Sequence, residues 1–304
     1  METTAQLTHN PPYAARRTSP LRKYLILLWR SRTATAGALI LLALVLTAIF
    51  QQQIATHNPA SQNIRARLTP PAWSEGGDPE HLLGTDQLGR DIFSRMVYGV
   101  RISLFVGFTG VLISGAIGCV LGLASGYFGG VTDTIIMRFV DVFLAFPFLL
   151  LAITFVVTLG PSLHNIIIVL GITGWVSYAR LVRGQTLSLR ELEYVQAARL
   201  LGASDFRIIF RHILPNLIAP VIIYSSMEVG IYIIVEASLT FLGMGIPPSI
   251  PTWGNMLATG RDYLSNAWWL ATFPGLAIVV TVLAFNFVGD WLRDILDPKS
   301  SYDL

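Results

Sequence analysis

The sequence predicts an all-α membrane protein with six transmembrane helices. Of its 304 residues, 53% are hydrophobic and only 13% are charged, whereas soluble domains carry about 25% charged residues. The apolar residues gather in runs close to the length of about 20 residues that a helix needs to cross a bilayer. We expect six spans, at residues 33–50, 102–128, 133–159, 162–182, 217–242 and 267–292.

The first span follows a polar, basic tail, residues 1–32. A secretory signal peptide has a shorter lead and ends in a small-residue cleavage site, so we interpret Thr33–Phe50 as a retained helix. Residues 51–100 are polar and contain four prolines, which predicts a loop outside the bilayer. Near its end, the apolar residues from Ile92 to Val100 recur at helical spacing. This periodicity predicts an amphipathic helix along the membrane surface, before the second span.

The other spans show features of packed transmembrane helices. Residues 102–128 carry glycines at spacings of three and four, which lets a neighbouring helix approach closely. Pro147 predicts a kink in the third span. Trp268 and Trp269 open the last span, where aromatic residues suit the membrane interface. We expect residues 101–293 to form the transmembrane domain proper.

The basic residues predict the orientation. Six Lys and Arg lie in residues 1–32 and six Arg lie in residues 180–216, whereas the connection near residue 160 has none. Because cytoplasmic connections are rich in Lys and Arg, both termini, including the tail 294–304, and residues 180–216 are expected in the cytoplasm. The basic residues lie mostly beside apolar runs, which argues against a nucleic-acid-binding protein.

Residues 190–216 interrupt the apolar chain with polar, helix-forming sequence. The segment Glu191–Leu201 predicts a helix that ends at Gly202, as glycine commonly does just past a helix end. Ser204 or Asp205 can cap a second helix, and Pro215 is expected to end it before the next span. The result is a helix, a glycine turn and a second helix.

Ala197 and Ala198 give the first of these helices a flat, small-residue face. Such a face accepts another protein's surface closely, although an ordinary amphipathic loop is an equal alternative.

The stretch resembles the EAA loop of membrane subunits of ATP-binding-cassette importers: Glu-Ala-Ala, three residues, Gly, nine residues, then Ile-x-Leu-Pro. The matching positions are Ala197, Ala198, Gly202, Leu214 and Pro215. Gln196 stands in place of Glu, so no acidic contact is expected there, and His212 stands in place of Ile. "GTDQLGRD" (84–91), "SLTFLGMG" (238–245) and "TVLAFNFVGDWLRDILDPK" (281–299) resemble the C-type membrane subunit of dipeptide and oligopeptide importers. Thr252 departs from that pattern, where an acidic residue is usual.

The resemblance implies a type I importer permease fold in a bacterial inner membrane, with residues 190–216 as a coupling loop that docks on a cytoplasmic ATPase. The residues expected to couple are Gln196, Ala197, Ala198, Gly202, Ala203, Ser204, Asp205, Leu214 and Pro215. The implied partners are two ATP-binding subunits, a second homologous permease subunit and an extracytoplasmic substrate-binding protein. The implied substrates are dipeptides or short peptides, with nickel, glutathione and longer oligopeptides as alternatives.

The sequence shows no motif for an ATPase site. A P-loop needs Gly-x4-Gly-Lys-Ser/Thr, and neither Lys23 nor Lys299 lies in such a motif. ATP and Mg²⁺ are therefore expected on the partner subunits, and no cofactor is expected on this chain. No catalytic motif appears either, and His57, His81 and His164 look isolated, so no metal site is expected.

Two further groups of residues are candidates for function. The turn at 84–91 is either a contact for the binding protein or a plain structural turn, and its residues are Gly84, Thr85, Asp86, Gly89, Arg90 and Asp91. Glu228 and Glu236 lie within a span, where acidic residues are functional candidates by default. Glu228 or Glu236 is expected to line the translocation pathway and to sense the amino group of a peptide. The alternatives are a proton relay in a secondary transporter and plain ion pairing.

Overall fold

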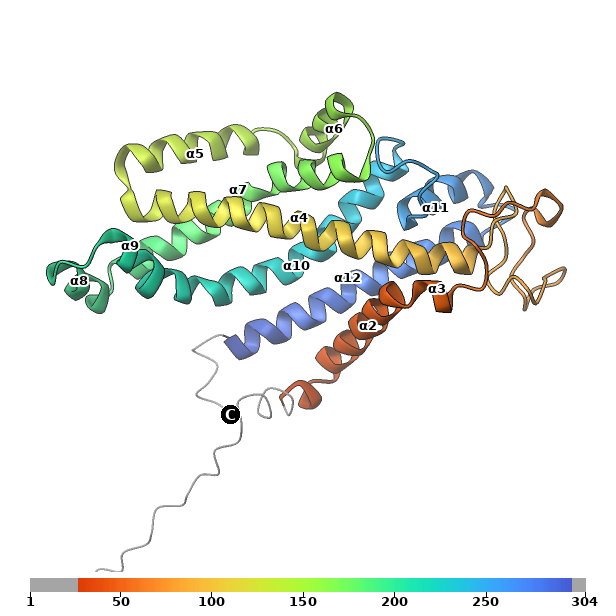
Figure 1. Ribbon diagram of the computed structural model, residues 1–304, viewed down its shortest axis with the longest axis horizontal. Helices are drawn as coiled ribbons and strands as arrows, with labels where there is room; N and C mark the ends of the chain where they lie inside the picture. The colour runs from red at the N-terminus through yellow and green to blue at the C-terminus, as the bar shows by residue number, and fades with distance from the viewer. Residues whose placement is uncertain (1–26, 297–304) are drawn as a thin grey trace, which may run out of the picture.

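The computed structural model describes residues 27–296 of the chain, so the predictions for residues 1–26 and 297–304 lie outside the described residues. All regular structure in the described part is helical, apart from one isolated antiparallel bridge between Thr85 and Asp91. Four long helices run alongside one another and form the body of the molecule (Figure 1): α4 (Ile92–Phe128), α7 (Leu163–Arg190), α10 (Leu214–Phe241) and α12 (Trp269–Leu296).

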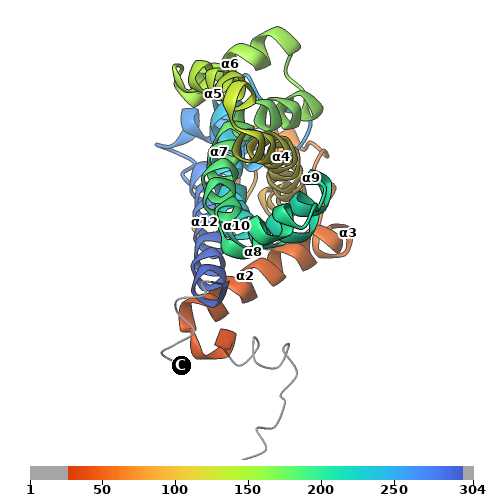
Figure 2. The same cartoon turned by 90° about the vertical axis from the view of Figure 1, so that its left-hand side faces the viewer.

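The remaining helices cover this body on two sides and at both ends. α2 (Arg32–Ile49) packs on α12 and α4, while α5 (Gly130–Leu144) and α6 (Phe148–Leu159) lie on the opposite side (Figure 2). α8 (Glu193–Leu200) and α9 (Asp205–Ile208) project at one end of the long helices, and the loop that follows α2 lies at the other end (Figure 1). That second end also holds the short elements α3 (Gln51–Ile54), η1 (Ile64–Ala66), α11 (Trp253–Gly260) and η3 (Arg261–Tyr263).

The helices agree with the predicted spans. Within residues 27–296, five helices are long and apolar enough to cross a membrane, and the count reaches six if the bent pair α5–α6 is one span. That pair is bent by 89°, far more than the kink expected at Pro147. Proline disfavours helical backbone at the residue before it, and Pro147 itself is extended, with ψ at 129°, so the helix stops and restarts there.

One prediction for the second span is wrong. Residues 92–100 do not form a separate helix along the membrane surface, because α4 runs unbroken from Ile92 to Phe128. The apolar residues of this segment pack inward instead: Val97 and Val100 are buried. Trp253 of α11 lies over Gly99 and donates a hydrogen bond from its indole to the carbonyl of Met96 at 3.2 Å. These contacts are long-range, so the local periodicity could not distinguish a core face from a membrane face.

The close approach predicted from the glycines of α4 is confirmed. A Cβ on Gly118 would lie 2.3 Å from Cβ of Tyr178, and one on Gly122 would lie 2.6 Å from the carbonyl oxygen of Ala179. Both neighbours belong to α7, so only glycine lets α4 and α7 pack at this distance. Because lipid provides no hydrophobic force between helices, such close van der Waals packing is what holds them together.

A second correction concerns the start of α10. Pro215 does not separate a cytoplasmic helix from the span, since α9 continues through the π-helical segment η2 (Ile209–Ile213) into α10. Pro215 lies in the first turn of α10, where its missing N–H is tolerated. The wider π turn just before it shifts the hydrogen-bond register, which lets the helix continue past the proline.

Candidate functional site

The turn between α8 and α9 is built on Gly202, which has a φ of +80°. The N–H of Gly202 donates to the carbonyl of Arg199 at 3.0 Å, and the N–H of Ala203 donates to that of Ala198 at 3.1 Å. This pair of bonds is the Schellman motif that ends many helices with a left-handed glycine. The predicted stop at Gly202 is therefore confirmed.

The second helix of this hairpin begins as predicted. Ser204 is its N-cap, and its hydroxyl accepts a hydrogen bond from the N–H of Arg207 at 3.4 Å. Asp205 follows in the first turn, where a negative charge is favourable beside the free N–H groups of the helix.

The hairpin is tied to the end of α4 by Tyr127. Its hydroxyl donates to the carboxylate of Asp205 at 2.6 Å, and the guanidinium of Arg199 lies 5.5 Å from the centre of its ring. Tyr127 was not identified from the sequence, because 78 residues separate it from Asp205 and no local pattern connects the two.

The hairpin has one buried and one exposed apolar face. On its inner face, Val195 and Ile208 are buried in a small core with residues of α4, α7 and α10. Its outer face, defined here as Ala197, Leu200, Leu201 and Phe206, is exposed. Leu200 is 89% exposed, Leu201 88% and Phe206 70%. Large apolar side chains gathered on an exposed surface are typical of a contact with another protein or with a membrane.

The predicted coupling residues occupy different positions in this hairpin. Ala197 is exposed on the outer face and Ala198 is half-buried. Gln196 points back into the chain, where its amide donates to the carbonyl of Arg190 at 2.9 Å and closes the corner between α7 and α8. Leu214 and Pro215 lie at the start of α10. The exposed leucines were missed, although two adjacent leucines before a glycine are visible in the sequence.

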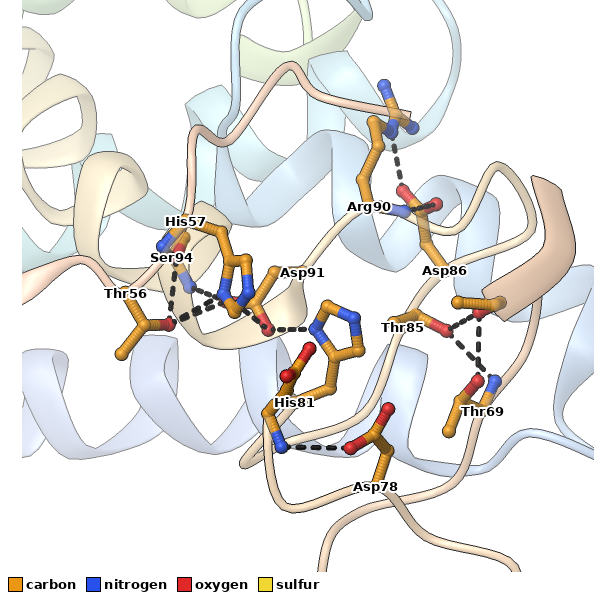
Figure 3. Close-up of polar contacts among 12 residues, drawn as sticks. Thr56, His57, Thr69, Asp78, His81, Thr85, Asp86, Arg90, Asp91 and Ser94 are labelled. Carbon is orange, nitrogen blue, oxygen red and sulfur yellow. Dashed lines mark hydrogen bonds and ion pairs between the residues drawn. The ribbon is translucent and has the colours of Figure 1, made fainter. Parts of the chain in front are cut away.

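At the other end of the molecule, the turn at residues 84–91 is a dense hydrogen-bonded structure (Figure 3). One carboxylate oxygen of Asp86 accepts from the N–H groups of Leu88 at 2.8 Å and Arg90 at 3.0 Å. Its other oxygen pairs with Nε of Arg90 at 2.6 Å. The N–H of Thr85 donates to the carbonyl of Thr69 at 2.9 Å. Asp86 and Arg90 thus form an ion pair within the turn.

This turn is buried within the chain. Thr85, Asp86, Arg90 and Asp91 are all buried, and the indole of Trp269 donates to the carbonyl of Thr85 at 3.1 Å. Its charged and hydroxyl side chains already have partners in their own chain, although Oε1 of Gln87 is buried without one. This favours the structural alternative over direct contact with a binding protein.

The expectation that His57 and His81 are isolated is wrong. The two rings lie beside each other, with centres 4.7 Å apart, and both stand next to the carboxylate of Asp91 (Figure 3). Nδ1 of His81 is 3.0 Å from Oδ1 of Asp91. The sequence spacing hid this cluster, because the loop folds back to bring together residues 24 and 34 positions apart.

Glu228 and Glu236 have different surroundings although they share α10. Glu228 lines a cavity of about 230 Å³ between α5, α6, α7 and α10, and it accepts a hydrogen bond from the hydroxyl of Tyr224. Glu236 is fully buried; its Oε1 accepts from the hydroxyl of Thr240 at 2.9 Å. Thr240 in turn accepts from the N–H of Ile246 at 3.2 Å, so Glu236 is part of a network that holds the end of α10.

Known proteins show the same organisation. Residues 118–302 match the family described as binding-protein-dependent transport system inner membrane component, and residues 19–71 match the N-terminal TM domain of oligopeptide transport permease C. A chain of the MetNI methionine ABC transporter, in an inward-facing conformation, is 19% identical with a TM-score of 0.53. The alignment covers 66% of this chain and 96% of that chain, so the two share a fold.

Relatives are similar along most of the chain. The dipeptide transport system permease protein DppC of Haemophilus influenzae is 46% identical, covering 92% of this chain and 95% of its own. The di/tripeptide permease protein DppC of Pseudomonas aeruginosa is 43% identical, covering 92% and 93%. The glutathione permease protein GsiD of Pectobacterium atrosepticum is 44% identical, covering 92% and 92%. The expected family and type I importer fold are confirmed, and the chain belongs to the binding-protein-dependent transport system inner membrane components.

Proposed function

We propose that this chain is the permease subunit of an ATP-driven importer of dipeptides or short peptides. The names of the relatives at 46% and 43% identity support this substrate class. Glutathione is the second candidate, since the glutathione permease is 44% identical, and glutathione is itself a short peptide.

The single observation that carries the proposal is the exposed outer face of the α8–α9 hairpin. Leu200 and Leu201 lie at the tip, beyond a glycine turn that Tyr127 holds against α4. Docked in a groove on an ATPase, the hairpin would transmit the movement of the ATPase to α7 and α10, the two helices to which it is directly joined. ATP and Mg²⁺ would bind to the ATPase.

The same proposal fixes the orientation and the partners. The α8–α9 end and both termini face the cytoplasm of a bacterial cell, as the basic residues of 180–216 favour, and the loop end faces the other side. Two ATPase subunits, a second homologous permease subunit and a substrate-binding protein complete the importer. Residues 101–293 form the transmembrane domain, and the pathway lies between the two permease subunits.

Glu228 is the residue of this chain best suited to the pathway. Its carboxylate borders a cavity large enough for several water molecules, and it would attract the amino group of a peptide. Glu236 is enclosed by its own chain and is less suited. Glu228→Gln is expected to weaken uptake of dipeptides; unchanged uptake in both Glu228→Gln and Glu236→Gln would exclude acidic residues of α10 from recognition.

The docking proposal is tested by purifying the tagged chain with its partners from gently solubilised membranes. Leu200→Ser combined with Leu201→Ser should lose the ATPase subunits but keep the second permease subunit. The matched control is Ile64→Ser, which removes a side chain that is 75% exposed at the opposite end and should keep both. Retention of the ATPases by the leucine variant would refute docking at the outer face.

The substrate class needs a separate measurement. The purified importer is reconstituted in liposomes with its binding protein, and ATP hydrolysis is followed with dipeptides, glutathione or longer peptides. Stimulation by dipeptides supports the first candidate and stimulation by glutathione alone supports the second. Uptake without ATP would favour the alternative of a proton-coupled transporter.

A further inference from the structure

Three ligand-type side chains converge at the start of α4 (Figure 3). One ligand atom from each of His57, His81 and Asp91 lies within 4.8 Å of the others. Oδ1 of Asp91 is 3.0 Å from Nδ1 of His81 and 3.9 Å from Nδ1 of His57. Two imidazoles and one carboxylate are a common set of ligands for Zn²⁺ and for similar divalent transition metals.

The two distances to Asp91 are compatible with a metal ion. Zn–N and Zn–O bonds of about 2.0–2.1 Å in a tetrahedral site place neighbouring ligand atoms about 3.3 Å apart. The two distances to Oδ1 of Asp91, 3.0 and 3.9 Å, lie on either side of that value. The ligand atoms of the two imidazoles lie within 4.8 Å of each other, so a movement of the His57 ring by up to about 1.5 Å would complete the geometry.

Only one of the two rings is hydrogen-bonded to Asp91. His81 bonds to Asp91 at 3.0 Å. His57 is too far from Asp91 for a hydrogen bond, and its Nδ1 lies instead 3.0 Å from the hydroxyl of Thr56. A metal ion between the three groups would be coordinated by both imidazole rings.

The groups around Asp91 already hold its carboxylate in position. Oδ2 accepts from the N–H of Ser94 at 2.7 Å and from the hydroxyl of Thr56 at 3.4 Å, which leaves Oδ1 to the histidines. The backbone N–H of His57 donates to the hydroxyl of Ser94 at 2.9 Å. Such outer contacts, which orient the ligands before the metal binds, are typical of metal sites in proteins.

We propose that His57, His81 and Asp91 bind one Zn²⁺ ion, or a divalent ion of the same class. The ligands come from three segments: the chain after α3, the loop before the 84–91 turn, and the N-cap of α4. Asp91 and His81 are buried and the side chain of His57 is 34% exposed, so the fourth position opens beside His57, where water would occupy it. The ion would fasten the loop to the long helices.

The test uses the full-length chain, purified with its co-purifying subunits in lipid nanodiscs and stripped with a chelator. Zn²⁺ is titrated against a competing chromophore, and bound zinc is measured by mass spectrometry. The wild type should bind one Zn²⁺ per chain more than the His57→Gln, His81→Gln double variant. His57→Gln alone should lower the affinity for Zn²⁺ at least about tenfold, because even the loss of an outer contact to a ligand lowers metal affinity by about 10- to 100-fold. The control His164→Gln, an exposed histidine outside the cluster, should bind as the wild type does.

Amide hydrogen exchange distinguishes zinc bound at this site from zinc bound by other histidines of the assembly. Zn²⁺ should slow amide hydrogen exchange in residues 55–91 of the wild type and have no such effect in His57→Gln. Because His57 is partly exposed and bonds only to Thr56 through its ring, this variant is expected to fold even if His81→Gln does not. Equal zinc content in the wild type and His57→Gln, or exchange in residues 55–91 that Zn²⁺ leaves unchanged, would overturn the proposal and leave His81 as a plain hydrogen-bond partner of Asp91.

Discussion

The two ends of the molecule differ in which side chains they bury and which they expose. At the loop end, charged and hydroxyl groups of residues 84–91 are buried and bonded to their own chain. At the α8–α9 end, large apolar side chains stand almost fully exposed. The polar turn of the first end is satisfied within this chain. Ile64 and Trp73 are exposed at that end too, but the most exposed large apolar side chains of the described residues are the adjacent Leu200 and Leu201 of the hairpin. The comparison teaches where to look for a partner: at these two neighbouring leucines.

One glycine at each end shows how tightly the surrounding residues are packed. Gly89 and Gly202 both have positive φ, at +69° and +80°. A Cβ on Gly89 would lie 1.8 Å from the carbonyl oxygen of Asn63, whereas nothing lies within 4 Å of one on Gly202. The same backbone conformation is therefore packed tightly at one end and open at the other.

The largest effect is expected from Asp86→Ala, which breaks the loop end. It leaves the guanidinium of Arg90 and two N–H groups without their acceptor in a buried site. Removing one partner of a buried ion pair costs about 3–5 kcal/mol. Thermal unfolding of the purified assembly should show the loss, whereas the exposed Glu75→Ala should unfold like the wild type. Equal unfolding temperatures for Asp86→Ala and wild type would mean that the turn is not a stabilising unit.

Gly89→Ala should have the next largest effect. The methyl group adds about 1–2 kcal/mol for left-handed backbone and about 1–3 kcal/mol for overpacking against Asn63. The two contributions together give an expected loss of about 2–5 kcal/mol, and hydrogen exchange should rise in residues 60–91. The comparison would fail if exchange rose as much in the hairpin as in this loop.

The parts of the fold that could be predicted from the sequence are those set by neighbouring residues or by the thickness of the bilayer. The apolar runs predicted the spans, because a helix that crosses lipid must be long and mostly apolar. Gly202 and Ser204 predicted the hairpin, because helix caps act within a few residues. The continuous α4 could not be predicted, since what buries Val97 and Val100 lies far away in sequence. The π turn before Pro215 was not predicted, because a proline alone does not show whether a helix ends there or continues through a local change in its hydrogen bonding.

The candidate site was predictable only in part, for the same reason. The coupling stretch was found as a motif, but the motif did not show that Gln196 turns inward to Arg190 or that Leu200 and Leu201 are the exposed residues. The cluster of His57, His81 and Asp91 was not visible because the three belong to separate segments that only the folded loop brings together.

Gly202→Ala separates the two effects that Gly89→Ala combines. It strains the left-handed backbone in the same way, but the new methyl group meets no neighbouring atom. The expected cost is about 1–2 kcal/mol, confined to the hairpin, with reduced coupling of ATP hydrolysis to uptake. Gly202→Asn should be milder, because asparagine tolerates left-handed backbone better than alanine does. Gly184→Ala, in the helical backbone of α7 with open space around it, is the control that should change neither property. A loss as large as that of Gly89→Ala would show that the hairpin is more tightly packed than its surroundings suggest.

The smallest effect is expected from Tyr127→Phe, which removes one hydrogen bond and keeps the ring under Arg199. A single hydrogen bond contributes about 1 kcal/mol, and here it joins α4 to the exposed start of α9. Hydrogen exchange should therefore rise in residues 193–208 and stay unchanged in residues 84–91. Tyr194→Phe is the matched control, because its hydroxyl bonds are longer, at 3.3 and 3.4 Å, and exposed. If both variants left exchange in the hairpin unchanged, the inner apolar face alone would hold the hairpin to the helices, and Tyr127 would be no more than part of that core.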